Sequence, residues 1–336
     1  MKALSALLIF LGLNLLAASN MDELKKAHEN HEVRSHTIWK EWKEKSIEQR
    51  IQSAPSNIIN YIGLDNKIYG YEGIPTAAPF DKAFHRDFMS AVEQLPKQVK
   101  KHIQENLIAI FFVNDLGSSG FSEHIYKEGK FFGSWLLFDQ GILSKLSANE
   151  WASWRAQSAF RPSKGYELSL KIAQDSANSR HEATAFILLH EIGHIVGSKI
   201  KAHPKPHEPK DNPKKFAYSS ISWISFEKSI FDKAFSSRKD FQLYRFDRSK
   251  LTLKNSKSFI EDLKKTDFIS LYGSNSFFED FAESYAIYVH TVLMKKPYEL
   301  TLLHKGKTVA SIINPFREKR MLKKREFFKK LFGKER

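Results

Sequence analysis

Apolar residues along this chain follow two patterns, one typical of helices and one of strands. Residues 84–104 repeat apolar and basic residues at the 3.6-residue period of a helix. The run 107–113, LIAIFFV, is apolar throughout and rich in β-branched and aromatic residues, and 133–139 has the composition of a second strand. Strands this close to a long buried helix predict an α+β fold with a small mixed sheet.

Two later stretches, 183–196 and 277–289, are apolar on most sides, which predicts helices buried in the core. Ser179 and Glu182 fit a capping box at the start of the first helix, and Gly197 supplies its end. Region 220–265 is expected to be helical. The segment 199–215 holds four prolines and six lysines and predicts an exposed, irregular insertion, with His203 and His207 in solvent.

The first nineteen residues have the pattern of a secretory signal peptide. Lys2 precedes an apolar stretch over 4–16, and Ala17-Ala18-Ser19 offers a small-x-small cleavage site. We therefore expect an exported protein, secreted or periplasmic. An uncleaved anchor helix is the alternative, although the apolar stretch is short for a membrane span of about 20 residues.

Composition narrows the chemistry that the chain can perform. The 336 residues include no cysteine, which excludes disulfides, thiolate zinc sites and cysteine nucleophiles. Any metal ion must therefore be held by histidines and carboxylates. With 53 Lys and Arg against 38 Asp and Glu, the net charge is +15, so contact with anionic surfaces is plausible. No specific nucleic-acid partner is predicted.

The C-terminal segment 317–336 contains ten Lys or Arg and three Glu, with apolar residues between them. Such a basic amphipathic helix could lie on an anionic membrane or polymer. Alternatively, it packs its apolar face on the domain and leaves its charges in water.

The helix predicted over 183–196 carries His190-Glu191-Ile-Gly-His194. Histidines at i and i+4 project from one helix face, at the separation that suits two ligands of a tetrahedral Zn²⁺. Glu191 lies beside the metal without binding it, where its carboxylate can take a proton from the zinc-bound water. Two histidines and a Glu in an otherwise apolar helix would be costly without a partner.

A third ligand is expected from the later buried helix. The histidine position of the H-E-x-x-H-x-x-G-x-x-H form is Ile200 here, so a carboxylate is required instead. Glu279 and Glu283 share a face of the 277–289 helix. The first can bind zinc, and the second can hydrogen-bond a ligand imidazole. In a competing interpretation, Ser276 and Glu279 form a capping box and Glu279 only satisfies backbone donors.

Together with the HExxH helix, the segment 272–283, YGSNSFFEDFAE, resembles the zinc peptidase domain of anthrax toxin lethal factor and its relatives, which include secreted proline-directed endopeptidases. The resemblance implies a zincin-like domain of the gluzincin type. It implies that Glu279 is the third ligand, that Glu283 supports the site, and that Tyr272 donates a hydrogen bond to the oxyanion. It also implies that the strand ending near Asp139 is the edge on which substrate lies.

These observations predict an exported zinc-dependent endopeptidase that acts on a protein or peptide, including a cell-wall peptide. Its expected parts are a signal peptide at 1–19, a helical segment and connector at 20–79, a metallopeptidase domain at 80–300 and a basic helical tail at 301–336. His194 and Glu279 are 85 residues apart, a longer separation than the resemblance leads us to expect. The alternative is a non-catalytic secreted binding protein with a structural zinc site and a basic tail.

Overall fold

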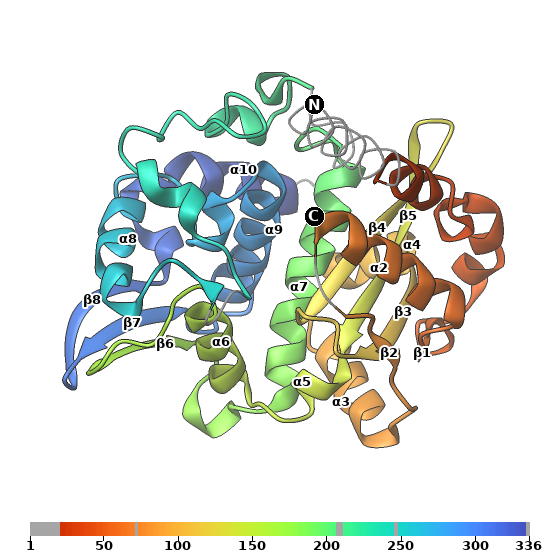
Figure 1. Cartoon of the computed structure of the whole chain (residues 1–336), viewed down its shortest axis with the longest axis horizontal. Helices are drawn as coiled ribbons and strands as arrows, with labels where there is room; N and C mark the ends of the chain where they lie inside the picture. Colours follow the sequence, from red (N-terminus) through yellow and green to blue (C-terminus); the bar gives the residue numbers. More distant parts are fainter. Residues whose placement is uncertain (1–20, 71–72, 206–210, 245–247, 334–336) are drawn as a thin grey trace, which may run out of the picture.

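The structure is a computed structural model, and it describes residues 21–70, 73–205, 211–244 and 248–333. The predicted signal peptide and His207 lie outside the described residues. The chain folds as a mixture of helices and strands arranged around one long central helix, α7 (Arg180–Lys199), as Figure 1 shows. The expected α+β class with a small mixed sheet is confirmed.

A five-stranded mixed sheet lies on one side of α7 (Figure 1). Strands β1 (Ile51–Ser53), β3 (Leu107–Asn114) and β5 (Lys130–Asp139) run parallel, and β4 (Gly120–Lys127) pairs antiparallel with β5. The short β2 (Thr76–Ala77) pairs with the end of β3. The two predicted strands are therefore present, and the first of them is almost completely buried because both of its faces are covered.

Helices cover both faces of this sheet. On one face α7 packs with α3 (Lys82–Glu93) and α4 (Lys97–Asn106) against side chains such as Leu107 and Phe112. On the other face, α2 (Ser56–Tyr69) and Trp39 cover Phe111 and Val113. The expected single helix over 84–104 is two helices, because Pro96 interrupts the chain between them and begins α4 as its N-cap.

The other half of the molecule is built around α9 (Phe277–Tyr288), which packs directly on α7. A π-helical turn follows at Val289–Leu293. This half also contains α6 (Ala148–Gln157), α8 (Ser256–Leu263) and an antiparallel sheet of β6 (Tyr166–Lys171), β7 (Glu299–His304) and β8 (Lys307–Ile313). The short α5 (Gln140–Leu143) lies on the side of the five-stranded sheet, against β3 and α7. Outside α8, the expected helical region 220–265 is mostly turns and short 3-10 helices.

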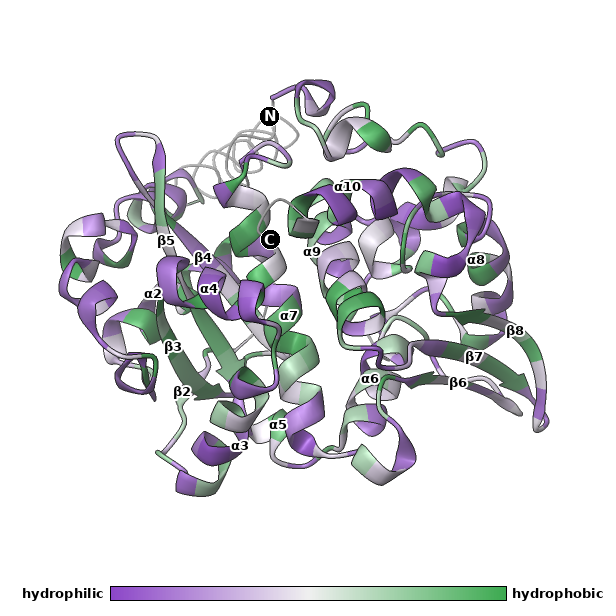
Figure 2. Cartoon of the chain, turned by 180° about the vertical axis from the view of Figure 1, so that it is seen from behind, coloured by the Kyte–Doolittle hydropathy of each residue, from purple (hydrophilic) through white to green (hydrophobic). Residues whose placement is uncertain are grey.

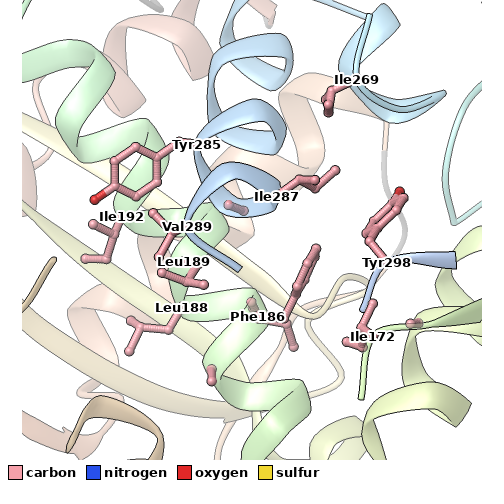
Figure 3. Close-up of a cluster of buried hydrophobic side chains, with 14 of the residues drawn as sticks. Ile172, Phe186, Leu188, Leu189, Ile192, Ile269, Tyr285, Ile287, Val289 and Tyr298 are labelled. Atoms are coloured by element: carbon pink, nitrogen blue, oxygen red, sulfur yellow. The ribbon is translucent and has the colours of Figure 1, made fainter. Parts of the chain in front are cut away.

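Helices α7 and α9 approach each other closely at a glycine. A Cβ atom at Gly193, inside the HExxH segment, would lie 2.8 Å from Ala282 Cα, so only glycine permits this crossing. Buried apolar side chains from both helices, including Leu189, Ile192 and Tyr285, fill the contact (Figure 3). The hydropathy view in Figure 2 shows the same helices as largely apolar where they meet. This crossing holds the two predicted ligand-bearing helices together.

The N-terminal segment differs from the expected helix and connector. After a helical stretch at 21–29, residues 32–50 form four short 3-10 helices, and Trp39 is buried. Residues 54–80, expected as a turn-rich connector, contain α2 and β2, and β1 forms at the end of the stretch 21–53 that was expected to be helical. The boundary placed at residue 79 therefore cuts through the sheet. Three residues of β1 and two of β2 are too few to show a strand pattern in sequence.

The C-terminal segment is not a separate helical tail, because residues 299–313 form the hairpin β7–β8. Helix α10 (Leu322–Gly333) then packs Phe328 and Phe332 against Tyr285 and Tyr288 of α9. Lys324 is fully buried, with Nζ 2.6 Å from Asp280 Oδ1. The helix thus has the packed arrangement that the sequence offered as the alternative to surface binding. Contact with an anionic surface stays a prediction.

Lys324→Ala is expected to destabilise the protein strongly. The change leaves the carboxylate of Asp280 buried without its cation, and breaking a buried ion pair costs about 3–5 kcal/mol. The free energy of unfolding in urea measures this cost. Lys329→Ala, an exposed lysine on the same helix, is the matched control and should change that free energy by less than about 0.5 kcal/mol. Equal losses in the two variants would contradict the role given to Lys324.

In the parts of the chain that the structure describes, we find no helix with the length and apolar character needed to cross a membrane.

Candidate metal centre

The structure brings His190, His194 and Glu279 together where α7 crosses α9. One ligand atom from each residue lies within 4.8 Å of the other two. Glu279 Oε2 is 3.3 Å from His190 Nε2 and 3.6 Å from His194 Nε2, and the two imidazole nitrogens are 3.2 Å apart. Two imidazoles and one carboxylate are the ligand set of catalytic His₂Glu zinc sites.

Glu279 is placed by the start of α9. Ser276 caps the helix, and its hydroxyl accepts a hydrogen bond of 3.2 Å from the Glu279 backbone N–H. The Glu279 side chain does not complete the capping box and turns instead toward the two imidazoles. Its Oε2 atom is buried and faces the Nε2 atoms of both rings. A buried acceptor beside two imidazole nitrogens fits a cation at this point.

Glu283 lies behind the imidazole of His190, one turn further along α9. Its Oε1 is 3.0 Å from His190 Nδ1 and accepts a hydrogen bond of 2.9 Å from Arg155, while Oε2 accepts one of 2.7 Å from Ser270. Burial raises the pKa of Glu283, but the Arg155 charge and these contacts outweigh burial and hold the pKa well below its usual range. The ionised carboxylate orients His190 with Nε2 toward Glu279.

The imidazoles are in contrasting electrostatic environments. Burial lowers the pKa of His194 to about 3, so this ring is neutral and its nitrogens are available to a metal. Burial also lowers the pKa of His190, but the hydrogen bonds and charges of Glu279 and Glu283 outweigh it and raise that pKa to about 10. The site therefore favours a positive charge between its carboxylates.

Glu191 points from α7 toward the first residues of β4. A Cβ atom at Gly120 would lie 2.8 Å from Glu191 Oε1, so the glycine leaves room for the carboxylate. Ser122 on the same strand lies beside the Glu191 carboxyl group. The side chain is buried, and burial raises the pKa of Glu191 to about 7. A carboxyl group poised near neutral pH can both accept and release a proton.

Tyr272 lies beside the three predicted metal ligands, with its ring against that of His190. Its ring stacks on His190 with the centroids 5.7 Å apart, and the Arg155 guanidinium lies 4.8 Å from the ring centre. Burial raises the pKa of Glu279, but the two histidines and the nearby Tyr272 hydroxyl outweigh burial and hold that pKa below its usual range. All the residues predicted for the site, His190, Glu191, His194, Tyr272, Glu279 and Glu283, thus come together in one place.

These residues open onto a cleft of about 520 Å³. Its walls are the β3–β4 loop with the first half of β4, the end of α2, and residues of α6, α7 and α9. Strand β4 pairs only with β5 among the described strands and so has one outer edge in the cleft. A single bridge from Ser35 to Tyr126 covers its far end.

The edge strand differs from the one that the resemblance implies. The strand that ends at Asp139 is β5, which lies between β3 and β4 in the interior of the sheet. The edge beside Glu191 is β4, whose sequence GFSEHIYK mixes polar and apolar residues and gave no strand signal. Asp139 instead caps the next helix and accepts a hydrogen bond of 2.8 Å from Leu116 N in the β3–β4 loop.

Three side chains near the site were missed or misplaced by sequence reasoning. His203, expected in solvent, is buried against Phe278, because the chain turns back under α7 after Ile200. His124 on β4 lines the cleft and contacts Ser134, and Tyr244 lines it from the segment before α8. No local pattern marks these residues, since only the folded chain brings them to the cleft.

Comparisons of the chain with protein-family models, with curated proteins and with solved structures gave no match. The interpretation of this site therefore rests on its own geometry and on the motifs that form it.

Proposed function

We propose that this protein is a zinc-dependent peptidase with a zincin-like catalytic domain, similar to that of the lethal factor group. The observation that carries the proposal is the convergence of His190, His194 and Glu279 at one point, with Glu191 beside them and directed to an open strand edge. A structural zinc site would take a fourth protein ligand, whereas a catalytic site keeps one position open.

Different residues of the site would bind the metal, orient its ligands and transfer the proton. His190, His194 and Glu279 would hold the zinc ion, and Glu283 would keep His190 in the required tautomer through its contact with Nδ1. When bound, zinc supplies Lewis-acid chemistry that lowers the pKa of water and polarises a carbonyl group. Glu191 accepts the proton of the attacking water at its carboxylate and carries it to the leaving amine.

The substrate we propose is a protein or peptide in extended conformation. Among the described strands β4 is the last of its sheet, and an extended peptide can add to the outer edge of such a strand as a further strand. Pairing with Gly120 and Ser122 would place a peptide bond beside Glu191. Export of the protein, as the first nineteen residues predict, would place this activity outside the cytoplasm.

Tyr272→Phe tests the role of the tyrosine hydroxyl. We expect kcat for peptide hydrolysis to fall on the order of 10²-fold, because one donor to the developing oxyanion is removed. Zinc content and the unfolding midpoint should stay unchanged, since the ring still stacks on His190. A variant that hydrolyses peptide at the wild-type rate would show that Tyr272 has no part in the reaction.

A further inference from the structure

The cleft is also lined by Tyr244, a tyrosine that the proposed chemistry does not use. It lines the same cavity as Glu191 and Tyr272. It belongs to the long segment between α7 and α8 that the lethal factor resemblance does not explain. Its phenol is close enough to Arg155 and Tyr272 to interact electrostatically with both. The segment between α7 and α8 therefore places a hydroxyl group in the cleft that the metal ligands also line.

The backbone of Tyr244 is held in an unfavourable conformation. Its φ angle is 59°, in the left-handed region that costs a non-glycine residue about 1–2 kcal/mol. The Tyr244 backbone N–H donates a hydrogen bond of 2.9 Å to Ser158 Oγ, and the ring packs on Trp154 with the centroids 5.7 Å apart. Such conformations persist where the surroundings fix them, and they concentrate at functional sites.

The hydroxyl of Tyr244 ends a short chain of polar groups. Trp151 Nε1 donates a hydrogen bond of 2.7 Å to Ser119 Oγ, and Ser119 Oγ lies 3.4 Å from the Tyr244 hydroxyl. An indole N–H can only donate, so the Ser119 hydroxyl keeps its own proton for another acceptor. Either hydroxyl can donate across the 3.4 Å contact, and when Ser119 is the donor the Tyr244 proton is free to point into the cleft.

We propose that Tyr244 is a substrate-binding residue whose hydroxyl donates a hydrogen bond to a backbone carbonyl of the bound peptide, with Ser119 as the positioning residue. This inference rests on the proposed peptidase function. Ser119 immediately precedes Gly120, so the hydroxyl lies at the end of the strand edge on which the peptide would pair. Glu191, beside Gly120, and Tyr244, beside Ser119, would then contact the same stretch of substrate.

The test measures peptide binding as well as turnover. A peptide that the wild-type protein cleaves is titrated into zinc-loaded Glu191→Gln protein, with and without Tyr244→Phe. We expect Tyr244→Phe to raise the Kd about tenfold, as loss of one hydrogen bond from the peptide predicts. In the protein with Glu191 intact, KM should rise similarly while kcat changes less, because the contact is made in both ground and transition states.

Two further variants separate binding from a structural role. Ser119→Ala should weaken peptide binding in the same direction, and adding it to Tyr244→Phe should cost little more, because both changes break one chain of contacts. Tyr166→Phe removes a hydroxyl outside the cleft and should leave Kd unchanged. Zinc content should be equal in all variants.

An unchanged Kd and KM in Tyr244→Phe would overturn the inference while leaving the peptidase function intact. The inference would also be overturned if Tyr244→Phe bound peptide more weakly only because the variant holds less zinc or has a lower unfolding midpoint. A wild-type protein that cleaves no peptide when loaded with zinc would overturn the proposed function, and the role of Tyr244 with it.

Discussion

Glu279→Ala is expected to produce a folded protein that is largely free of zinc and has lost its activity. The change removes the carboxylate that contacts both imidazoles and leaves two ligands, too few to hold the ion against a chelator. The measurement is zinc per chain after dialysis against a chelator concentration that the wild-type protein resists. The helix cap at Ser276 is retained, so the unfolding midpoint should change little without metal.

Glu283→Ala is the comparison variant, one turn away on the same helix. Its carboxylate contacts His190 Nδ1, Arg155 and Ser270, and not the nitrogens that face Glu279. Loss of such a supporting contact typically lowers metal affinity or activity by about 10–100-fold. We therefore expect this variant to keep zinc where Glu279→Ala loses it, with reduced turnover. The reverse order would make Glu283 the ligand and Glu279 a helix cap, and would remove the support for the role of Tyr272.

Glu191→Gln is expected to abolish most hydrolysis without loss of metal. Glutamine keeps the size of the side chain and its contact with Ser122 but cannot accept the proton, and positioned proton transfer contributes about 10²–10⁴-fold to rate. Zinc should remain near one ion per chain, because Glu191 lies outside the ligand group. Glu167→Gln, the same change at an exposed position of β6, should leave both quantities unchanged. Normal turnover in Glu191→Gln would end the peptidase hypothesis.

The elements that sequence predicted well are those whose patterns are local. The apolar run 107–113 and the apolar stretches 183–196 and 277–289 became β3, α7 and α9, because the length and residue types of each stretch are a local signal for a buried strand or helix. The ligand group followed from these helices, since i and i+4 spacing fixes which side chains share a face. Gly193 then allowed the helices to cross closely enough to join the two halves.

The features that sequence missed depend on contacts between distant segments. The capping box proposed for Ser179 and Glu182 does not form, because Glu182 binds Lys296, far along the chain. The edge strand β4 is identified only by its place in the sheet. His203 is buried despite its proline- and lysine-rich surroundings, since Ala202, His203 and Pro204 turn inward beneath α7. In each case a tertiary contact overrode the local pattern.

The measurement that tests the central claim most directly is a peptide-library digest in which zinc is first removed from the protein and then restored. Wild-type protein is stripped with chelator, divided, and assayed before and after addition of one equivalent of zinc, beside zinc-loaded Glu191→Gln. We predict cleavage products only in the wild-type sample restored with zinc. Cleavage that persists without metal, equal cleavage by Glu191→Gln, or none by the zinc-loaded wild type would contradict the account.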